Sequence, residues 1–328
     1  ELTSLANWLS DAEANCLSSL DKNDRSSRSY VAIGAIYRDV GQYTKALEYL
    51  EKAAQIDGFD YASSITLAGT YDLVGKKDTA EKIYIRALKK FPKNWRVYSA
   101  YGYFLTRNGR HEDAIKNYKY VLEFIPENIN ALNNLAISYM YVGDFEMSAK
   151  LFEKASLIEA DSAVLVNTGT MYYSSGHFEK AAFFYERALK LEPNNYQWMA
   201  YLGDSYKFIP SRKKDADYYF NDVIKYALQE IKVNKDIARS YQYLARAYTH
   251  FHELPKANEM MEIADAINAT STESYYSHLR IAVAEKNDGK ILHYTRLLLE
   301  NEYSLKLLIA DPDFQVLKEE RFKNVMFD

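Results

Sequence analysis

Small and large apolar residues recur along this chain at an interval of 34 positions. A small residue, glycine or alanine, stands at one recurring site: Gly34, Ala68, Gly102 and Ala136. A larger side chain follows three residues later in each interval: Tyr37, Tyr71, Leu105 and Tyr139. Spacings of three and four residues place side chains on one face of an α-helix. Each interval therefore predicts an amphipathic helix in its first half.

A second helix is predicted in the other half of each interval. It carries alanine at a fixed place, in Ala46, Ala80 and Ala114. Gly41, Gly75 and Gly109 stand between the two helices, where glycine can adopt the left-handed conformation that ends a helix. Pro92 and Pro126 end the second helix. Because no single pair can bury its apolar faces alone, stacked pairs should share one continuous core.

The interval divides most of the chain into eight units. The fourth is one residue short, the sixth has a longer second helix, and the eighth keeps only part of the pattern. The predicted units are residues 27–60, 61–94, 95–128, 129–161, 162–195, 196–237, 238–271 and 272–303.

Both ends carry additional helical patterns. Ala12, Cys16 and Ser19 lie 34 residues before Ala46, Leu50 and Ala53, so residues 1–26 are predicted to hold half a repeat. The end of a repeat array exposes apolar helix surface if no further helix covers it. We therefore expect either a folded-back segment or a homodimer contact there. Residues 304–328 are predicted to form a C-terminal capping helix through four apolar residues: Phe314, Leu317, Phe322 and Val325.

These units resemble the tetratricopeptide repeat (TPR), in which glycine, alanine, tyrosine and proline recur at these positions. The resemblance implies an all-α, right-handed α-solenoid of about eight helix pairs. Residues 92–98, 134–143 and 167–176 and the closing Asp311-Pro312-Asp313-Phe314 are similar to the C-terminal TPR arrays of bacterial serine/threonine kinases and of membrane-anchored winged-helix regulators. This second resemblance implies the sensory or interaction arm of a bacterial signalling protein, periplasmic if anchored in that way and otherwise cytoplasmic. The sequence itself contains no kinase or winged-helix motif.

Composition narrows the classes of partner. The net charge is −4, which argues against nucleic acid as the main partner because phosphate binding needs a basic surface. No apolar run approaches the length of a membrane span. A single cysteine, Cys16, excludes an intrachain disulfide and a cysteine-based metal site.

The sequence offers little for catalysis. Nine of the 12 glycines are used by the repeat, so no phosphate-binding loop remains. His250 and His252 form the one histidine pair worth testing for a metal, and no third ligand follows them. Asp215 and Asp217 are interpreted as solvated charges at a helix start. We therefore expect no catalytic residue, no metal site and no cofactor.

The 30 tyrosines need two explanations. Some occupy core positions of the repeat, such as Tyr118 and Tyr185. Others lie on the opposite side of the first helix, which lines the concave groove in TPR proteins. The groove residues predicted in this way are Tyr103, Arg107, Asn133, Asn134, Tyr141, Asn167, Tyr173, Tyr201, Lys207, Tyr243 and Arg246.

Asn134 and Asn167 share one repeat position, which is similar to the asparagine ladder by which TPR proteins hold a peptide backbone. An amide offers both a donor and an acceptor to a peptide bond, and tyrosine adds rigid contact area with a polar tip. The predicted partner is a protein or an extended peptide. Self-association and the sensing of a small ligand are the alternatives.

Overall fold

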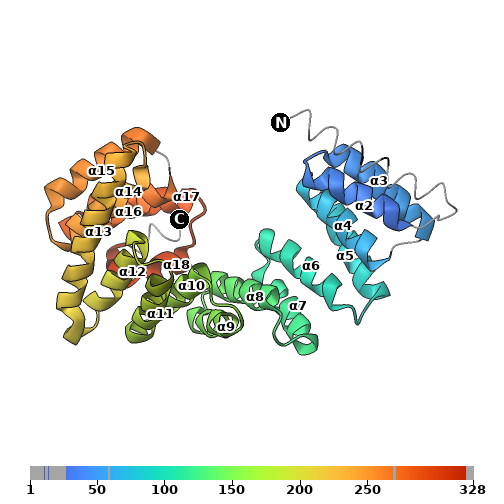
Figure 1. The fold of residues 1–328 in the computed structure, drawn as a ribbon, viewed down its shortest axis with the longest axis horizontal. Coiled ribbons are helices and arrows are strands. Elements are labelled where there is room, and N and C mark those ends of the chain that lie inside the picture. Colours follow the sequence, from blue (N-terminus) through green and yellow to red (C-terminus); the bar gives the residue numbers. More distant parts are fainter. Residues whose placement is uncertain (1–10, 12–13, 15–26, 58–59, 269–270, 323–328) are drawn as a thin grey trace. The chain divides into compact units, whose positions relative to one another are not determined.

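The computed structural model describes residues 11, 14, 27–57, 60–268 and 271–322, and all regular structure in them is helical. The chain forms two compact units, Glu1–Asn134 and Leu135–Asp328 (Figure 1). The predicted N-terminal half-repeat lies almost wholly outside the described residues, as does Val325. The homodimer contact expected at that half-repeat falls outside them too.

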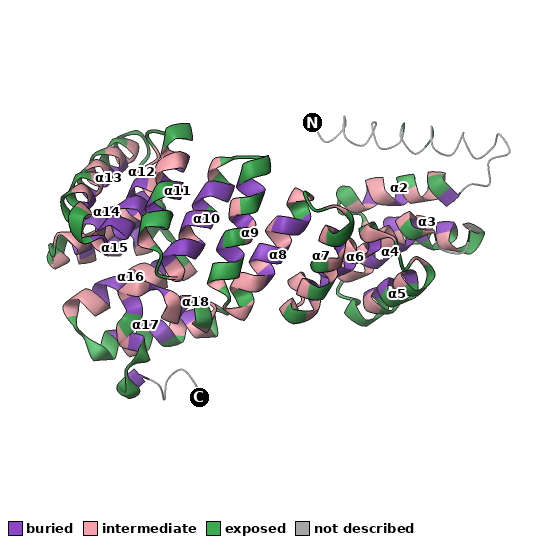
Figure 2. Cartoon of the chain, turned by 90° about the horizontal axis from the view of Figure 1, so that it is seen from below, coloured by how far each residue is buried: buried purple, intermediate pink, exposed green. Residues whose placement is uncertain are grey.

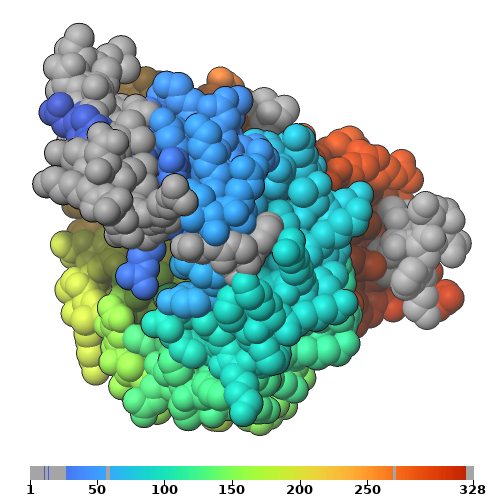
Figure 3. Space-filling model, turned by 90° about the vertical axis from the view of Figure 1, so that its right-hand side faces the viewer, coloured from blue at the N-terminus to red at the C-terminus, as the bar shows by residue number. Residues whose placement is uncertain are grey.

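The N-terminal unit consists of helix pairs that follow one another along the chain. Its helices are α2 (Ser27–Asp39), α3 (Tyr43–Asp57), α4 (Tyr61–Leu73), α5 (Lys77–Lys90), α6 (Trp95–Arg107), α7 (His111–Phe124) and the first part of α8 (Ile129–Val142). The side chains of α4 to α7 pack into a continuous body, light blue to cyan in Figure 3.

The C-terminal unit continues the same alternation and ends in two short helices. After the second part of α8 come α9 (Phe145–Ile158), α10 (Ser162–Ser174), α11 (Phe178–Leu191), α12 (Tyr196–Lys207), η1 (Pro210–Arg212), α13 (Lys213–Val233), α14 (Ala238–His250), α15 (Leu254–Asn268), α16 (Thr272–Glu285), α17 (Asp288–Glu300), α18 (Leu305–Ala310) and η2 (Pro312–Lys318). Buried residues run as stripes along α9, α10 and α11, where these helices face their neighbours (Figure 2).

The first helix of every pair begins at the residue where the 34-residue spacing places the start of a unit. This holds from α2, which begins at Ser27, to α16, which begins at Thr272. We therefore number positions within each repeat from the first residue of the first helix. The all-α solenoid of helix pairs is confirmed. The long second helix of the sixth repeat is α13, which buries Ala216, Phe220 and Val223 along one side.

The two helices of a pair approach most closely at position 8. A Cβ added to Gly102 would lie 2.9 Å from the ring of Tyr118 on the second helix. A Cβ added to Gly169 would lie 2.8 Å from the ring of Tyr185. Atoms cannot pack this closely, so the missing side chain of glycine makes room for the ring.

Tyrosine hydroxyls connect neighbouring repeats. Tyr206, at position 11, donates a hydrogen bond to Glu186, at position 25 of the preceding repeat. Tyr71 donates to Glu51 between the same two positions in the N-terminal unit. Burial and the bond to Glu51 together raise the pKa of Tyr71 to about 12. At these positions tyrosine provides a directional link that phenylalanine would lack.

The closing segment departs from the predicted cap. Phe314, Leu317 and Phe322 are buried as the apolar pattern requires. They do not lie on one α-helix, however: Phe314 and Leu317 belong to the 3₁₀-helix η2, which follows α18 after Asp311, and Phe322 lies beyond the end of η2 at Lys318. Proline has no N–H to donate, and it disfavours helical geometry in the residue before it.

We expect that Ala181→Leu will destabilise the C-terminal unit. Ala181 on α11 is fully buried between helices, so a larger side chain overpacks the contact and costs about 1–3 kcal/mol. Ala163→Leu is the matched control, because Ala163 on α10 is exposed. Urea unfolding followed by circular dichroism measures both. Equal losses of stability in the two variants would contradict the assigned repeat register.

Candidate functional site

Positions 2, 5, 6, 9, 12 and 13 of the first helices form a surface that we call the first-helix face. In the N-terminal unit this face is lined mainly by small residues, such as Thr66 and Gly69 on α4 and Ala100 on α6. Tyr103 stands out from it with 53 % of its surface exposed. The guanidinium of Arg107 lies 5.9 Å from the centre of the Tyr103 ring, forming a cation–π pair.

Arg107 of this face forms an ion pair with Asp72 on α4, with 3.3 Å between Nη1 and Oδ2. The N-terminal unit also holds the two predicted asparagines of α8. Asn133 and Asn134 are both half-buried, and the side-chain oxygen of Asn133 has no hydrogen-bond partner. The face therefore combines an exposed aromatic–cation pair with amides, the groups from which peptide contacts are built.

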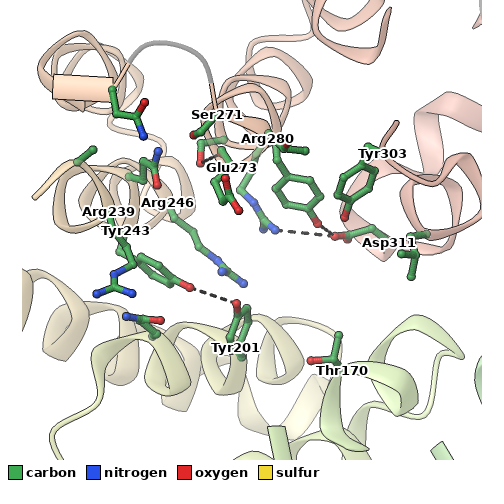
Figure 4. Close-up of a pocket in the computed structure, with 18 of the residues that line it drawn as sticks. Thr170, Tyr201, Arg239, Tyr243, Arg246, Ser271, Glu273, Arg280, Tyr303 and Asp311 are labelled. Atoms are coloured by element: carbon green, nitrogen blue, oxygen red, sulfur yellow. Dashed lines mark hydrogen bonds and ion pairs between the residues drawn. The ribbon is translucent and has the colours of Figure 1, made fainter. Parts of the chain in front are cut away.

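The first-helix face of the C-terminal unit has a different character. Tyr141 and Asn167 are exposed, whereas Tyr173 is buried. Tyr173, Tyr201, Tyr243 and Arg246 line one cavity of about 880 Å³ between α10, α12, α14, α16 and the closing segment. In Figure 4, Arg246 points into this cavity from α14 while Tyr303 and Asp311 approach from the closing segment.

A buried ion cluster closes one end of this cavity. Asp204 on α12 is 2 % exposed and contacts three cations. Its carboxylate accepts from Nε of Arg246 at 2.8 Å, and it lies 2.7 Å from Nζ of Lys207 and 3.4 Å from Nη1 of Arg280. Asp313 in η2 joins the same cluster through Lys207, at 3.0 Å, and through Arg280.

The pKa values of the two buried carboxylates Asp204 and Asp311 shift in opposite directions. Burial raises the pKa of Asp204, but the charges of Arg246, Lys207 and Arg280 outweigh this effect and hold the pKa well below its usual value. Burial also raises the pKa of Asp311, and there Arg280 does not overcome it. Asp311 lies 3.9 Å from Arg280 and accepts a hydrogen bond from Tyr276. The cluster thus stabilises the charged form of Asp204, whereas burial disfavours the charged form of Asp311.

The closing segment lies against the first-helix face. Lys306 donates from Nζ to the carbonyl oxygen of Val142 at the end of α8, at 3.0 Å. Leu307 packs on the apolar cluster that contains Tyr173, and Asp313 binds Lys207 as described. The predicted groove residue Lys207 is therefore engaged by the chain's own C-terminal segment.

Several residues of this site were missed by the sequence interpretation. Asp204 and Arg280 stand at position 9 of their repeats, as Arg246 does, so the repeat numbering could have found them. Asp311 and Asp313 carried no such signal. Asp313 meets Lys207 across 106 residues, a contact that only the fold reveals.

Two further observations concern metal binding and membrane spanning. His250 packs on the ring of Phe220 and lies 2.7 Å from Asp217, and the described part of the chain contains no group of three residues suited to bind a metal. Among the same described residues, no helix is both long and apolar enough to span a membrane.

Comparison with known proteins places this architecture in a class. Four stretches match models described as tetratricopeptide repeat, at residues 27–60, 74–129, 131–162 and 162–195. The photosystem I assembly protein Ycf3 of Acaryochloris marina is 32 % identical over 146 residues, which are 44 % of this chain and 67 % of that protein. The chain is thus an all-α protein built of stacked helix pairs. It belongs to the tetratricopeptide-repeat family.

Other relatives are longer or more distant. Superkiller protein 3 of Schizosaccharomyces pombe is 27 % identical over 186 residues, 53 % of this chain, and the chain spans only 13 % of its length. The solved C-terminal part of a TPR repeat-containing protein from Cytophaga hutchinsonii superposes with a TM-score of 0.56 at 20 % identity, covering 74 % of this chain and 97 % of that one. This last likeness concerns the fold alone.

Asp204→Asn and Asp311→Asn should affect stability with opposite signs at pH 7. Removing the charge of Asp204 leaves buried cations uncompensated and should cost about 3–5 kcal/mol. Asp311→Asn should be neutral or stabilising by on the order of 1 kcal/mol, because burial penalises the charged form of Asp311 in the folded state.

The pH dependence checks the assignment. Because the pKa of Asp204 is lower in the folded than in the unfolded state, its charged form stabilises the fold at every pH above the unfolded-state pKa. The loss of stability in Asp204→Asn should therefore persist at neutral pH and shrink below about pH 4. The pKa of Asp311 is raised in the folded state, so its protonated form contributes to the stability of the fold. This contribution is lost as the pH rises. Urea unfolding at several pH values measures both. A large loss at pH 7 in Asp311→Asn would contradict the distinction.

Proposed function

We propose that this chain is a scaffold that binds an extended peptide or protein along its first-helix faces, and that it acts by binding and not by catalysis. The eleven groove residues predicted from the sequence are the proposed contacts. Within each unit they come from successive first helices, so a partner lying across the first helices of one unit would meet the contacts of that unit in order.

The observation that carries this proposal is the contact between the closing segment and the first-helix face of the C-terminal unit. There a backbone carbonyl receives Lys306, and Asp313 is bound by Lys207 and Arg280. These are the interactions that an external peptide would need: hydrogen bonds to the backbone and ion pairs to its side chains. The face thus has the chemistry to hold a polypeptide.

The N-terminal unit supports the proposal through its exposed chemistry. Tyr103 and Arg107 present an amphipathic ring and a planar cation, side-chain types that often dominate protein interfaces. The small residues beside them leave room for a partner to approach the helices. Ycf3, a relative at 32 % identity, is named for assembly of a protein complex, which agrees with a scaffold role.

The finer proposal is that the chain serves as the interaction arm of a bacterial signalling protein. It rests on the resemblance of residues 92–98, 134–143 and 167–176 and of the closing segment to arrays joined to kinases or winged-helix regulators. The sequence before Glu1 in the parent gene tests it. A kinase or winged-helix signature there would support the proposal, and a parent protein without an effector domain would contradict it.

Peptide binding can be tested with a display library of random peptides selected on the whole chain. Peptides that bind the first-helix face should lose about tenfold in affinity for the double variant Tyr103→Ala, Arg107→Ala, because an aromatic and a cationic contact are both removed. Tyr103→Ala alone should leave the melting temperature nearly unchanged, since Tyr103 is exposed.

The chain offers a matched control for this variant. The exposed Phe183 and the half-buried Arg187 form an aromatic–cation pair with the same spacing along the chain, 5.7 Å between guanidinium and ring centre, on the second helix α11. Phe183→Ala with Arg187→Ala should leave affinity unchanged. If the selected peptides instead depend on Phe183 and Arg187 and ignore Tyr103 and Arg107, the second helices form the binding surface and the proposal fails.

A further inference from the structure

The cavity of the C-terminal unit has the size of a site for a compact ligand. Its volume of about 880 Å³ falls within the range of small-molecule sites, roughly 300–1,000 Å³. The first helices α10, α12, α14 and α16 form its walls, and Tyr303, Leu307 and Asp311 of the closing region bound it on another side. The closing segment, together with Tyr303 just before it, therefore turns part of the first-helix face into a pocket.

The walls of this cavity are aromatic. Tyrosine rings reach it from every repeat that contributes: Tyr173, Tyr185, Tyr201, Tyr243 and Tyr276, with Tyr303 added by the closing region. Arg246 lies 4.8 Å from the ring centre of Tyr201 and 5.6 Å from that of Tyr243, so the cation is framed by two rings. Such walls suit a flat ring on the ligand, because aromatic faces stack on one another.

Three cations lie at the buried end of the cavity. Three cations, Lys207, Arg246 and Arg280, meet the carboxylates of Asp204 and Asp313. The third carboxylate, Asp311, has its pKa raised by burial and accepts a hydrogen bond from Tyr276. At the rim, Arg239 is exposed to solvent together with Asp236 and Glu273.

A buried hydroxyl without a partner marks the same cavity. The side-chain oxygen of Tyr173 has no hydrogen-bond partner, and the residue is 8 % exposed. A buried, unsatisfied hydroxyl is costly and rare in folded proteins. Tyr173 lines the cavity, so an acceptor on a ligand would satisfy it.

We propose that this cavity binds a small organic anion in which a carboxylate is joined to a flat ring, with the ring against Tyr201 and Tyr243 and the carboxylate at Arg246 and the hydroxyl of Tyr173. Guanidinium and hydroxyl donors match a carboxylate, which only accepts hydrogen bonds. The inference assigns a ligand of a different class to four of the proposed peptide contacts, Tyr173, Tyr201, Tyr243 and Arg246. A site of this kind would give the C-terminal unit a ligand of its own.

Fluorine NMR on the whole chain provides a direct test, with 4-fluorophenylacetate as the probe. A fragment of this size should bind with a dissociation constant of about 1–5 mM. Its neutral amide, 4-fluorophenylacetamide, should bind at least about fivefold more weakly, and the cation 4-fluorobenzylamine more weakly still. Trp198 stacks on Tyr201 with ring centres 5.9 Å apart, so its fluorescence gives a second readout.

Two variants locate the probe. Tyr173→Phe removes the unpartnered hydroxyl and keeps the ring, so the ligand-free protein should melt at the same or a higher temperature while affinity for the probe falls about fivefold. Arg239→Gln changes an exposed rim residue and should weaken the anion about two- to threefold without affecting folding. Arg296→Gln, an exposed residue of α17 that does not line the cavity, is the matched control and should change nothing.

Three results would overturn the proposal. One is no binding of 4-fluorophenylacetate at about 10 mM. The second is equal binding of the acid, the amide and the amine, which would show that charge plays no part. The third is an affinity for the acid that neither Tyr173→Phe nor Arg239→Gln reduces. If Tyr173→Phe failed to fold, the affinities of Arg239→Gln and Arg296→Gln for 4-fluorophenylacetate would still decide the outcome.

Discussion

The close approach of the two helices at position 8 fixes the geometry on which the array depends. At Gly102, Gly169 and Gly203, the ring of a residue on the second helix lies where a side chain would otherwise stand. Ring and glycine together set how far apart the helices lie and how each is rotated. Rotation decides which side chains of the first helix face the core and which reach the first-helix face. The candidate binding residues are therefore positioned by a contact on the opposite side of their helix.

The high tyrosine content follows from three separate requirements of the fold and its surface. Rings such as that of Tyr118 fill the space beside glycine. Hydroxyls such as that of Tyr206 bind a glutamate of the preceding repeat. Where Leu105 takes position 11, the preceding repeat has Ile85 at position 25, so the polar link is replaced by two apolar residues at once. Other tyrosines, including Tyr201 and Tyr243, line the cavity.

The sequence was sufficient to predict the helix pairs, because the same apolar spacing, turn residues and small packing residues recur from repeat to repeat. It predicted the site less completely. The expected open groove became a cavity in the C-terminal unit because the closing segment lies against it, and the meeting of Lys207 with Asp313 depends on tertiary structure alone. Burial of Tyr173 has the same origin, since Leu307 packs on its cluster. Asp204 and Arg280 were within reach, because they share position 9 with Arg246.

The ion cluster is better explained by the properties of the site than by stability. Taking charges out of water is expensive, and apolar side chains of similar volume often replace buried ion pairs without loss of stability. The repeats themselves show that this fold needs no such cluster, because position 9 of α4 is Gly69 and the helix forms regardless. What Asp204, Arg246 and Arg280 provide is a fixed arrangement of charge at the end of an aromatic cavity. Fixed charges cost little reorganisation when a ligand arrives, and that is the condition under which a buried polar group contributes to recognition.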